Sequence, residues 1–170
     1  MKILGIDPGT VATGYGMVEA VRGGLLRLVC QGVVRPGPRL PLSGRLNEIA
    51  AGLNSIMALH APDAVAIETV FYAVNAKSAI TLAHARGVAM LISAQAAVPV
   101  YEYAPRSIKL SVTGYGNAEK EQVQKMIGII LKTKEVTEPD AADALAAALC
   151  HINHSSGVVG AKALNPATAV

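Results

Sequence analysis

Two apolar runs without polar alternation stand out along the chain, and an acidic residue closes each of them. Residues 3–6 read Ile-Leu-Gly-Ile and are followed by Asp7, and residues 64–67 read Ala-Val-Ala-Ile and are followed by Glu68. A strand that is apolar at every position is typical of the centre of a sheet covered on both faces. The pattern therefore predicts two central strands that carry Asp7 and Glu68 to their carboxyl ends, where open α/β sheets bind ligands.

The other elements follow from turn signals and from the helical spacing of apolar residues. Arg22-Gly23-Gly24 is a hairpin signal between two further strands, so three consecutive strands open the fold. From Leu42 to about His60, apolar residues recur at spacings of three and four, which predicts an amphipathic helix. The elements expected after the first strand are, in chain order, strands over 13–20 and 25–35, a helix over 42–60, the strand that ends at Glu68, a helix over 75–97, a strand over 100–103 and helices over 119–132 and 139–153.

A chain of 170 residues is most simply one domain with a sizeable core. We assign that domain to residues 1–154 and expect the small and polar tail over 155–170 to be disordered. Hydrophobic residues make up 52% of the chain, yet no apolar stretch approaches the length of a membrane span. The N-terminus enters a strand at once, which leaves no room for a signal peptide and favours a cytoplasmic protein without membrane contact. Two distant cysteines, Cys30 and Cys150, fit reduced thiols in that compartment.

The predicted helix over 75–97 is apolar almost all round. From Ala79 onward its polar residues are Thr81, His84, Arg86, Ser93 and Gln95. One face is enough to cover a small sheet, so the opposite face needs another explanation. Either it meets a second subunit, which would make the protein a homodimer, or the helix is wholly buried in the centre of the fold; we prefer the homodimer, and both explanations stay open.

The last predicted helix is a third source of acidic residues. Proline is favoured at a first helical position, so Pro139 places Asp140 and Asp143 in or next to the first turn, on one face of the helix. Taken singly, each acid can be a turn former, a cap or a salt-bridge partner. Together with Asp7 and Glu68 they predict an oxygen-ligand site for Mg²⁺ or Mn²⁺, because like charges in a partly dry site need a compensating cation.

The rest of the surface is basic. The net charge of the whole chain is only +3, from 15 Lys and Arg against 12 Asp and Glu. Setting aside the four candidate site acids leaves eight acidic residues and an excess of +7. A basic surface around an acidic pocket suits a polyanion whose phosphate must meet a metal, although a mildly basic soluble protein remains the plainer reading of charge alone.

A series of short motifs follows along the chain. They are Leu4-Gly5-Ile6-Asp7-Pro8-Gly9-Thr10, Thr13-Gly14-Tyr15-Gly16, Ala66-Ile67-Glu68-Thr69-Val70-Phe71, Asn75-Ala76-Lys77-Ser78-Ala79, Ala85-Arg86-Gly87-Val88-Ala89, Glu102-Tyr103-Ala104, Ala118-Glu119-Lys120 and Asp140-Ala141-Ala142-Asp143-Ala144-Leu145-Ala146. In this order, over residues 2 to about 152, the chain resembles the RuvC family of Holliday junction resolvases.

The resemblance implies a fold and a metal site. It implies a ribonuclease H-like α/β fold, with a five-stranded mixed sheet that opens with three antiparallel strands, continues with parallel strands and is flanked by helices. The family's metal-binding acids correspond to Asp7, Glu68, Asp140 and Asp143. These residues would hold two Mg²⁺ ions, with Mn²⁺ as a substitute.

The resemblance also implies contacts with DNA. Phe71, the chain's single phenylalanine, corresponds to a loop residue that stacks at the opened junction; core packing is the alternative. Lys109 and Lys120 correspond to lysines that contact the DNA backbone, whereas the sequence alone favours ordinary solvated charges. If Asn117 caps the following helix, Lys120 lies in its first turn. Further candidate contacts are Tyr72, Lys77 and Arg86.

The activity implied is that of an endonuclease in recombination and DNA repair. A homodimer would cut opposing strands of four-way junction DNA symmetrically and leave 5′-phosphate and 3′-hydroxyl nicks, with the family's RuvA and RuvB proteins as partners. Three alternatives are an actin-like kinase or ATPase, a junction-binding module without catalysis, and a ribonuclease H-like enzyme that acts on RNA or hybrids. The first is disfavoured because it needs two such domains and because no Walker lysine motif is present.

Overall fold

A five-stranded mixed sheet forms the centre of the molecule. The structure, a computed structural model, describes residues 1–69, 76–134, 136 and 138–155, without the side chains of residues 76–78. The strands are β1 (Lys2–Asp7), β2 (Thr13–Ala20), β3 (Leu26–Val34), β4 (Ala64–Glu68) and β5 (Val100–Tyr103), in the order β3-β2-β1-β4-β5. Pairing is antiparallel from β1 to β2 and from β2 to β3, and parallel from β1 to β4 and from β4 to β5. The predicted mixed sheet is confirmed.

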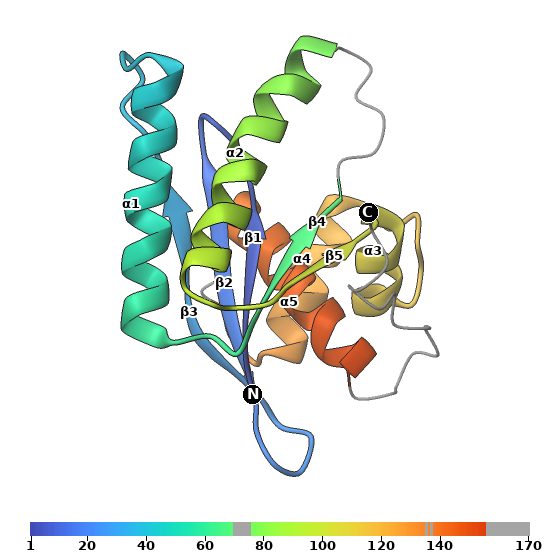
Figure 1. Ribbon diagram of the computed structural model, residues 1–170. Coiled ribbons are helices and arrows are strands. Elements are labelled where there is room, and N and C mark those ends of the chain that lie inside the picture. Colours follow the sequence, from blue (N-terminus) through green and yellow to red (C-terminus); the bar gives the residue numbers. More distant parts are fainter. Residues whose placement is uncertain (70–75, 135, 137, 156–170) are drawn as a thin grey trace, which may run out of the picture.

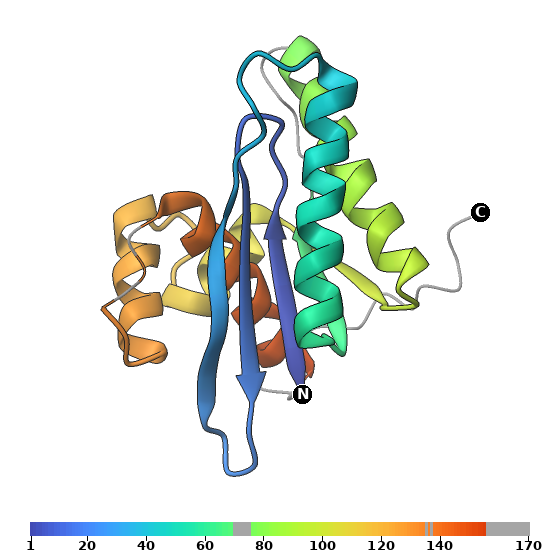
Figure 2. The same cartoon turned by 90° about the vertical axis from the view of Figure 1, so that its left-hand side faces the viewer.

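Helices cover both faces of this sheet. They are α1 (Leu42–His60), α2 (Ala76–Gln95), α3 (Pro105–Thr113), α4 (Lys120–Ile130) and α5 (Pro139–Ser155). Figure 1 and Figure 2 show α1 and α2 on one face, and α5 with α3 and α4 on the other. The order of elements and this layering fit the expected ribonuclease H-like fold. Within the described residues, no helix is both long and apolar enough to cross a membrane.

Each face of the sheet has its own core, because β1 and β4 send apolar side chains in both directions. Leu4 and Ile6 pack toward α1 and α2, whereas Ile3 belongs to the core under α5. All of these side chains have 0% exposure. This double burial explains why the runs 3–6 and 64–67 are continuously apolar.

The helix α5 lies unusually close to the sheet. A Cβ atom added to Gly5 would lie 1.8 Å from the carbonyl oxygen of Ala144, and one added to Gly14 would lie 2.0 Å from that of Asp140. On the helix side, alanines fill most of the contact, and Ala141, Ala142 and residues 144–152 are buried. Glycine on the strands and alanine on the helix therefore bring the backbone of α5 against β1 and β2.

Three expectations about the helices need correction. The helix α3 was not predicted, although Pro105 at its start and the buried pair Ile108 and Val112 are typical of a short amphipathic helix. Asn117 does not cap α4; Glu119 does, through a reciprocal capping box with Gln122.

The third correction concerns α2, which is not wholly buried. Ile80 is 59% exposed and Leu91 is 56% exposed. Ala83 and Gly87, which share their helix face, are exposed as well. An apolar stripe therefore faces outward along this helix, and the wholly buried alternative is wrong.

Candidate functional site

Asp7 and Glu68 lie side by side at one edge of the sheet. The parallel register pairs Ile6 with Ile67, so the next residues of β1 and β4 are Asp7 and Glu68. Both are partly buried. The predicted delivery of two carboxylates to adjacent strand ends is what the structure shows.

The other two acids reach the same edge from α5. Asp140 is the second residue of α5, and Asp143 follows three residues later. Gly14 pairs with Asp7 across the β1–β2 ladder. The same glycine lies against the backbone of Asp140, so the missing side chain at position 14 brings the first turn of α5 next to Asp7.

The four carboxylates lie near enough to act on one another electrostatically. The pKa of Asp7 is raised from its ordinary 3.8 to about 7, first because burial disfavours the charged form and then because Asp143, Glu68 and Asp140 repel its charge. Burial is also the first cause that raises the pKa of Glu68, and Asp143 is the second. Such mutual destabilisation marks a pocket that lacks positive charge.

Two lysines supply part of that charge. Lys120 is the first residue of α4, and its Nζ lies 2.5 Å from Oδ2 of Asp143. This hydrogen bond is the main reason why the pKa of Lys120 is raised. The positive charge of Lys120 lowers the pKa of both Asp7 and Glu68, and Lys109 acts in the same direction on Glu68.

The donor set fits a hard divalent cation. All four groups are carboxylates, the oxygen ligands that Mg²⁺ and Mn²⁺ prefer, and neither histidine nor cysteine is part of the set. Among the described residues, no three acidic, histidine or cysteine side chains already converge as a finished metal cage. The four carboxylates therefore have the donor atoms that suit such a cation, and Asp143 is paired with Lys120 in this arrangement.

Of the remaining predicted DNA contacts, some lie within the described residues and some do not. Phe71, Tyr72 and the side chain of Lys77 lie outside the described residues. Lys109, on α3, lowers the pKa of Glu68, and Lys120 contacts Asp143, so both lysines lie near the acids. Arg86 forms an ion pair with Glu102, a motif residue for which the sequence predicted no role.

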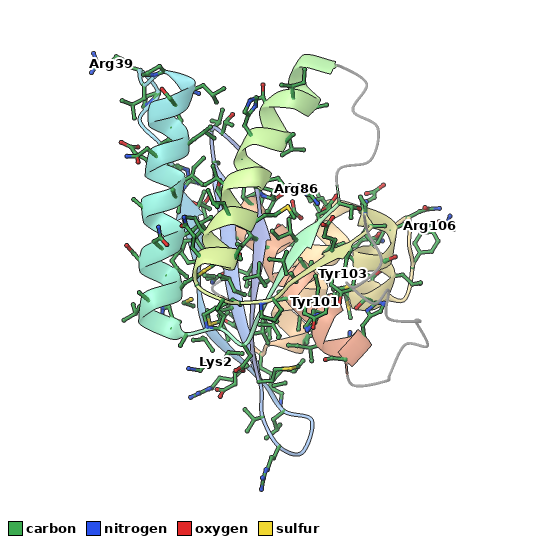
Figure 3. All side chains as sticks on the ribbon, viewed as in Figure 1. Lys2, Arg39, Arg86, Tyr101, Tyr103 and Arg106 are labelled. Atoms are coloured by element: carbon green, nitrogen blue, oxygen red, sulfur yellow. The ribbon has the colours of Figure 1, made fainter. Side chains whose placement is uncertain are left out.

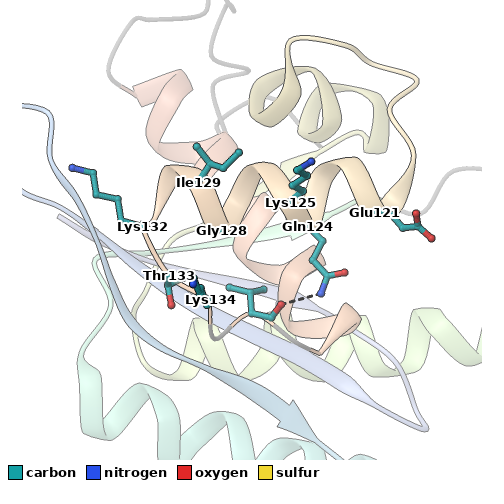
Figure 4. Close-up of a pocket in the computed structure, with 9 residues that line it drawn as sticks. Glu121, Gln124, Lys125, Gly128, Ile129, Lys132, Thr133 and Lys134 are labelled. Atoms are coloured by element: carbon teal, nitrogen blue, oxygen red, sulfur yellow. Dashed lines mark hydrogen bonds between the residues drawn. The ribbon is translucent and has the colours of Figure 1, made fainter.

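A separate groove follows α4 and the chain after it. Its volume is about 580 Å³, and Figure 4 shows Gln124 of α4 bonded to the backbone of Val136 at its wall. None of the four acids lines it; the lining residues are Glu121, Gln124, Lys125, Gly128, Ile129, Lys132, Thr133, Lys134 and Val136.

Comparison with known proteins gives one consistent answer. The family model described as crossover junction endodeoxyribonuclease RuvC matches residues 3–151. A protein of that name from Acidobacterium capsulatum is 51% identical, over 93% of this chain and 96% of its own. Another from Desulforamulus reducens is 45% identical, over 92% of this chain and 96% of its own. The solved structure of Thermus thermophilus RuvC in complex with a Holliday junction substrate is 35% identical, with a TM-score of 0.85 over 91% of this chain and 94% of its own.

Proposed function

This chain belongs to the RuvC family of crossover junction endodeoxyribonucleases, and from that premise we propose that it resolves four-way DNA junctions by metal-assisted hydrolysis at Asp7, Glu68, Asp140 and Asp143. The observation that carries the proposal is geometric: Asp7 and Glu68 end adjacent parallel strands, and the first turn of α5, with Asp140 and Asp143, packs on Gly14, the partner of Asp7. The raised pKa of Asp7 agrees with this crowding. A buried carboxylate among three others stabilises neither the fold nor its own charge. Such an arrangement is understandable where a divalent cation belongs at the site.

The position of Asp7 suggests how the acids divide their work. Asp7 is repelled by all three of the others, whereas Asp143 is the one carboxylate that raises the pKa of Glu68. In this proposal Asp7 would help to hold both metal ions, Glu68 and Asp143 would each help to hold one, and Asp140 would complete the set. When bound, two Mg²⁺ ions would supply the charge that activates water and stabilises the leaving oxygen, giving 5′-phosphate and 3′-hydroxyl ends.

Lys120 has a separate role in the proposed function. It lies beside the acids at the start of α4, where it forms an ion pair with Asp143. The side chain of Lys120 is 56% exposed, and its ammonium group would bind the DNA backbone next to the scissile phosphate. Lys109 would add a second backbone contact from α3, near Glu68.

Residues outside the described part of the chain complete the DNA contacts. Phe71 follows Glu68 by three residues, close enough along the chain for its ring to stack on a base unpaired at the crossover, a contact that contributes roughly 1 to 3 kcal/mol. Tyr72 would stack beside it, and Lys77 would bind phosphate near the start of α2.

We propose that the protein acts as a homodimer through the exposed apolar stripe of α2. Two sites related by a two-fold axis would face opposing strands of a junction, which explains paired symmetric cuts that can be ligated. The proposed role is in recombination and repair of DNA, and the proposed compartment is the cytoplasm. By family likeness, RuvA and RuvB would be its branch-migration partners.

One assay tests this function against its alternatives. The protein is incubated with Mg²⁺ and, in parallel, with labelled four-way junction, linear duplex and RNA–DNA hybrid. We expect paired nicks in the junction alone. Cleavage of the hybrid would favour a ribonuclease, binding without cleavage would favour a junction-binding module, and hydrolysis of ATP without nicking would favour the actin-like alternative.

A further inference from the structure

The connection between α3 and α4, residues 114–119, presents an exposed aromatic ring. Tyr115 is 60% exposed, and a glycine stands on either side of it in the chain. Near the start of α3, Arg106 points away from the sheet (Figure 3). Single exposed rings are common on protein surfaces, so the setting of this one decides whether it has a role.

The backbone that carries the ring is fixed by local hydrogen bonds. The hydroxyl oxygen of Thr113 accepts the N–H of Tyr115 at 3.1 Å and donates to the carbonyl oxygen of Lys109 at 2.8 Å. Gly114 ends α3 in the left-handed conformation, with φ of 76°. The N–H of Ala118 donates to the carbonyl oxygen of Tyr115 at 3.2 Å. Because this loop is ordered before anything binds, a partner that contacts the ring loses less entropy on binding.

The surroundings of the ring are positively charged. Residues 104–118 include two basic side chains and no acidic one. The next acid, Glu119, is engaged in the capping box of α4. Arg106 forms no ion pair with an acid in the described part of the chain. A Cβ atom added to Gly116 would lie 2.7 Å from Cγ of Arg106, so the stem of this arginine lies along the backbone next to Tyr115.

The loop also joins the two helices whose lysines lie near the acids. Lys109 of α3 lowers the pKa of Glu68, and Lys120 of α4 contacts Asp143. A DNA strand whose phosphates meet both lysines therefore passes the loop between them. Positive charge beside an exposed aromatic ring is the combination on which nucleotides stack in nucleic-acid sites.

We propose that Tyr115 is a DNA contact, whose ring packs on the face of a nucleotide in the strand bound by Lys109 and Lys120, while Arg106 binds a phosphate of the same strand. The proposal rests on the proposed function. It adds to that function a stacking contact on the α3–α4 side of the acids, which is separate from Phe71 in the connection after β4.

Junction affinity without divalent metal tests the contact apart from cleavage. The ring is uncharged, so Tyr115→Ala should weaken binding of a labelled four-way junction by about fivefold or more, with the salt dependence of the native protein. Tyr115→Phe keeps the aromatic face and should bind as the native protein does. Arg106→Gln should instead lower the salt slope by about one.

The matched control is Ile129→Ala. Ile129 is also 60% exposed and lines the separate groove along α4, so its loss should leave junction affinity unchanged. Urea unfolding should give Tyr115→Ala the stability of the native protein, because an exposed ring contributes little to the core. This measurement keeps a loss of binding apart from a loss of folded protein.

Crosslinking shows whether the contact is direct. The photoreactive substitution Tyr115→p-benzoylphenylalanine should crosslink to the junction under light, and the same substitution at Ile129 should not. A crosslink at position 115 would distinguish a contact with DNA from an effect of Tyr115 on the neighbouring lysines.

Four results would overturn the proposal. They are native affinity in Tyr115→Ala, a lowered salt slope in that variant, weak binding by Tyr115→Phe, and absence of a crosslink from position 115. Native protein that binds the junction and leaves it intact in Mg²⁺ would contradict the proposed hydrolysis and not this contact. Native protein that does not bind the junction would refute both.

Discussion

The backbone of Asp140 rests directly on Gly14, so closely that a Cβ atom at position 14 would lie 2.0 Å from the carbonyl oxygen of Asp140. Because Gly14 also pairs with Asp7, this one contact sets the spacing between the strand acid and the helix acids. The absence of a side chain at one position is thus part of the geometry of the site.

Replacing Gly14 with alanine is therefore expected to displace the first turn of α5. The clash is with backbone, which cannot rotate away, so overpacking should lower the free energy of unfolding by about 1 to 3 kcal/mol. Cleavage should fall by at least about tenfold, since Asp140 and Asp143 move together. Urea unfolding and single-turnover cleavage measure the two effects.

The matched control is Gly44→Ala in α1. An added Cβ there meets its nearest neighbour, Leu40, at an ordinary 3.4 Å, and alanine favours a helix more than glycine does. This variant should keep full activity and lose no stability. Equal behaviour of the two variants would show that the close approach of α5 does not position the acids.

Without metal, the protein should lose stability as the pH rises. The folded state holds a proton on Asp7 up to about pH 7, against an ordinary pKa of 3.8. Between these values the folded state binds more protons than the unfolded state, so stability is fully present below pH 4 and is lost through pH 7. The loss is on the order of 2 to 4 kcal/mol.

Urea unfolding in EDTA at pH 5 and pH 8 measures this loss. Asp7→Asn should remove most of it, leaving a smaller part from Glu68, whose pKa is raised as well. Addition of Mg²⁺ at pH 8 should stabilise the native protein, because an ion that binds only the folded state shifts the equilibrium toward it. A native protein that becomes more stable from pH 5 to pH 8 would contradict this account of the site.

Removal of Lys120 should move the pH dependence of cleavage. Its charge lowers the pKa of Asp7 and Glu68, so Lys120→Gln should shift the rising limb of the pH–rate profile toward higher pH. Rates at saturating protein keep this effect apart from any loss of DNA affinity.

Two other lysines serve as comparisons for the shift in the pH–rate profile. Lys109 lowers the pKa of Glu68, whereas Lys120 acts on both Asp7 and Glu68, so Lys109→Gln should give a smaller shift. Lys134 is exposed and lines the separate groove along α4, so Lys134→Gln should give none. Identical profiles for all three variants would argue against a special place for Lys120.

Charges on the α2 stripe should separate the subunits. In the proposed homodimer, Ile80→Asp with Leu91→Asp places carboxylates in an apolar interface, where unpaired charge is strongly unfavourable. Light scattering after size exclusion should show twice the chain mass for the native protein and a single chain mass for the variant. The control is Leu59→Asp on α1, because Leu59 is 78% exposed. A native protein of single chain mass would refute the dimer.

Much of this fold follows from local patterns that tertiary contacts reinforce. The runs before Asp7 and Glu68 are apolar on both faces because helices cover both sides of the sheet, so pattern and environment agree. The helix α1 runs from Leu42 to His60 as predicted. The helix α3 is short, and its two buried apolar residues, Ile108 and Val112, lie four positions apart and so span a single helical turn. An apolar pattern of one turn does not distinguish a helix from a loop.

The candidate site was predictable in its residues and not in its contacts. Parallel strands end at one edge, so two apolar runs place Asp7 and Glu68 together. The pairing of Lys120 with Asp143 depends on how α4 meets α5, and no local rule gives the packing of two helices. The same holds for Arg86 and Glu102, which come together only because α2 crosses β5.

The measurement that tests the central claim most directly compares native protein with Asp7→Asn on a labelled four-way junction in Mg²⁺. Because Asp7 is repelled by all three other acids, its replacement should lower the single-turnover rate by about a thousandfold or more. Junction affinity, measured without divalent metal, should change by no more than about threefold, since the DNA contacts lie elsewhere. A variant that still cuts the junction within about tenfold of the native rate would contradict the claim that these four carboxylates form the catalytic metal site.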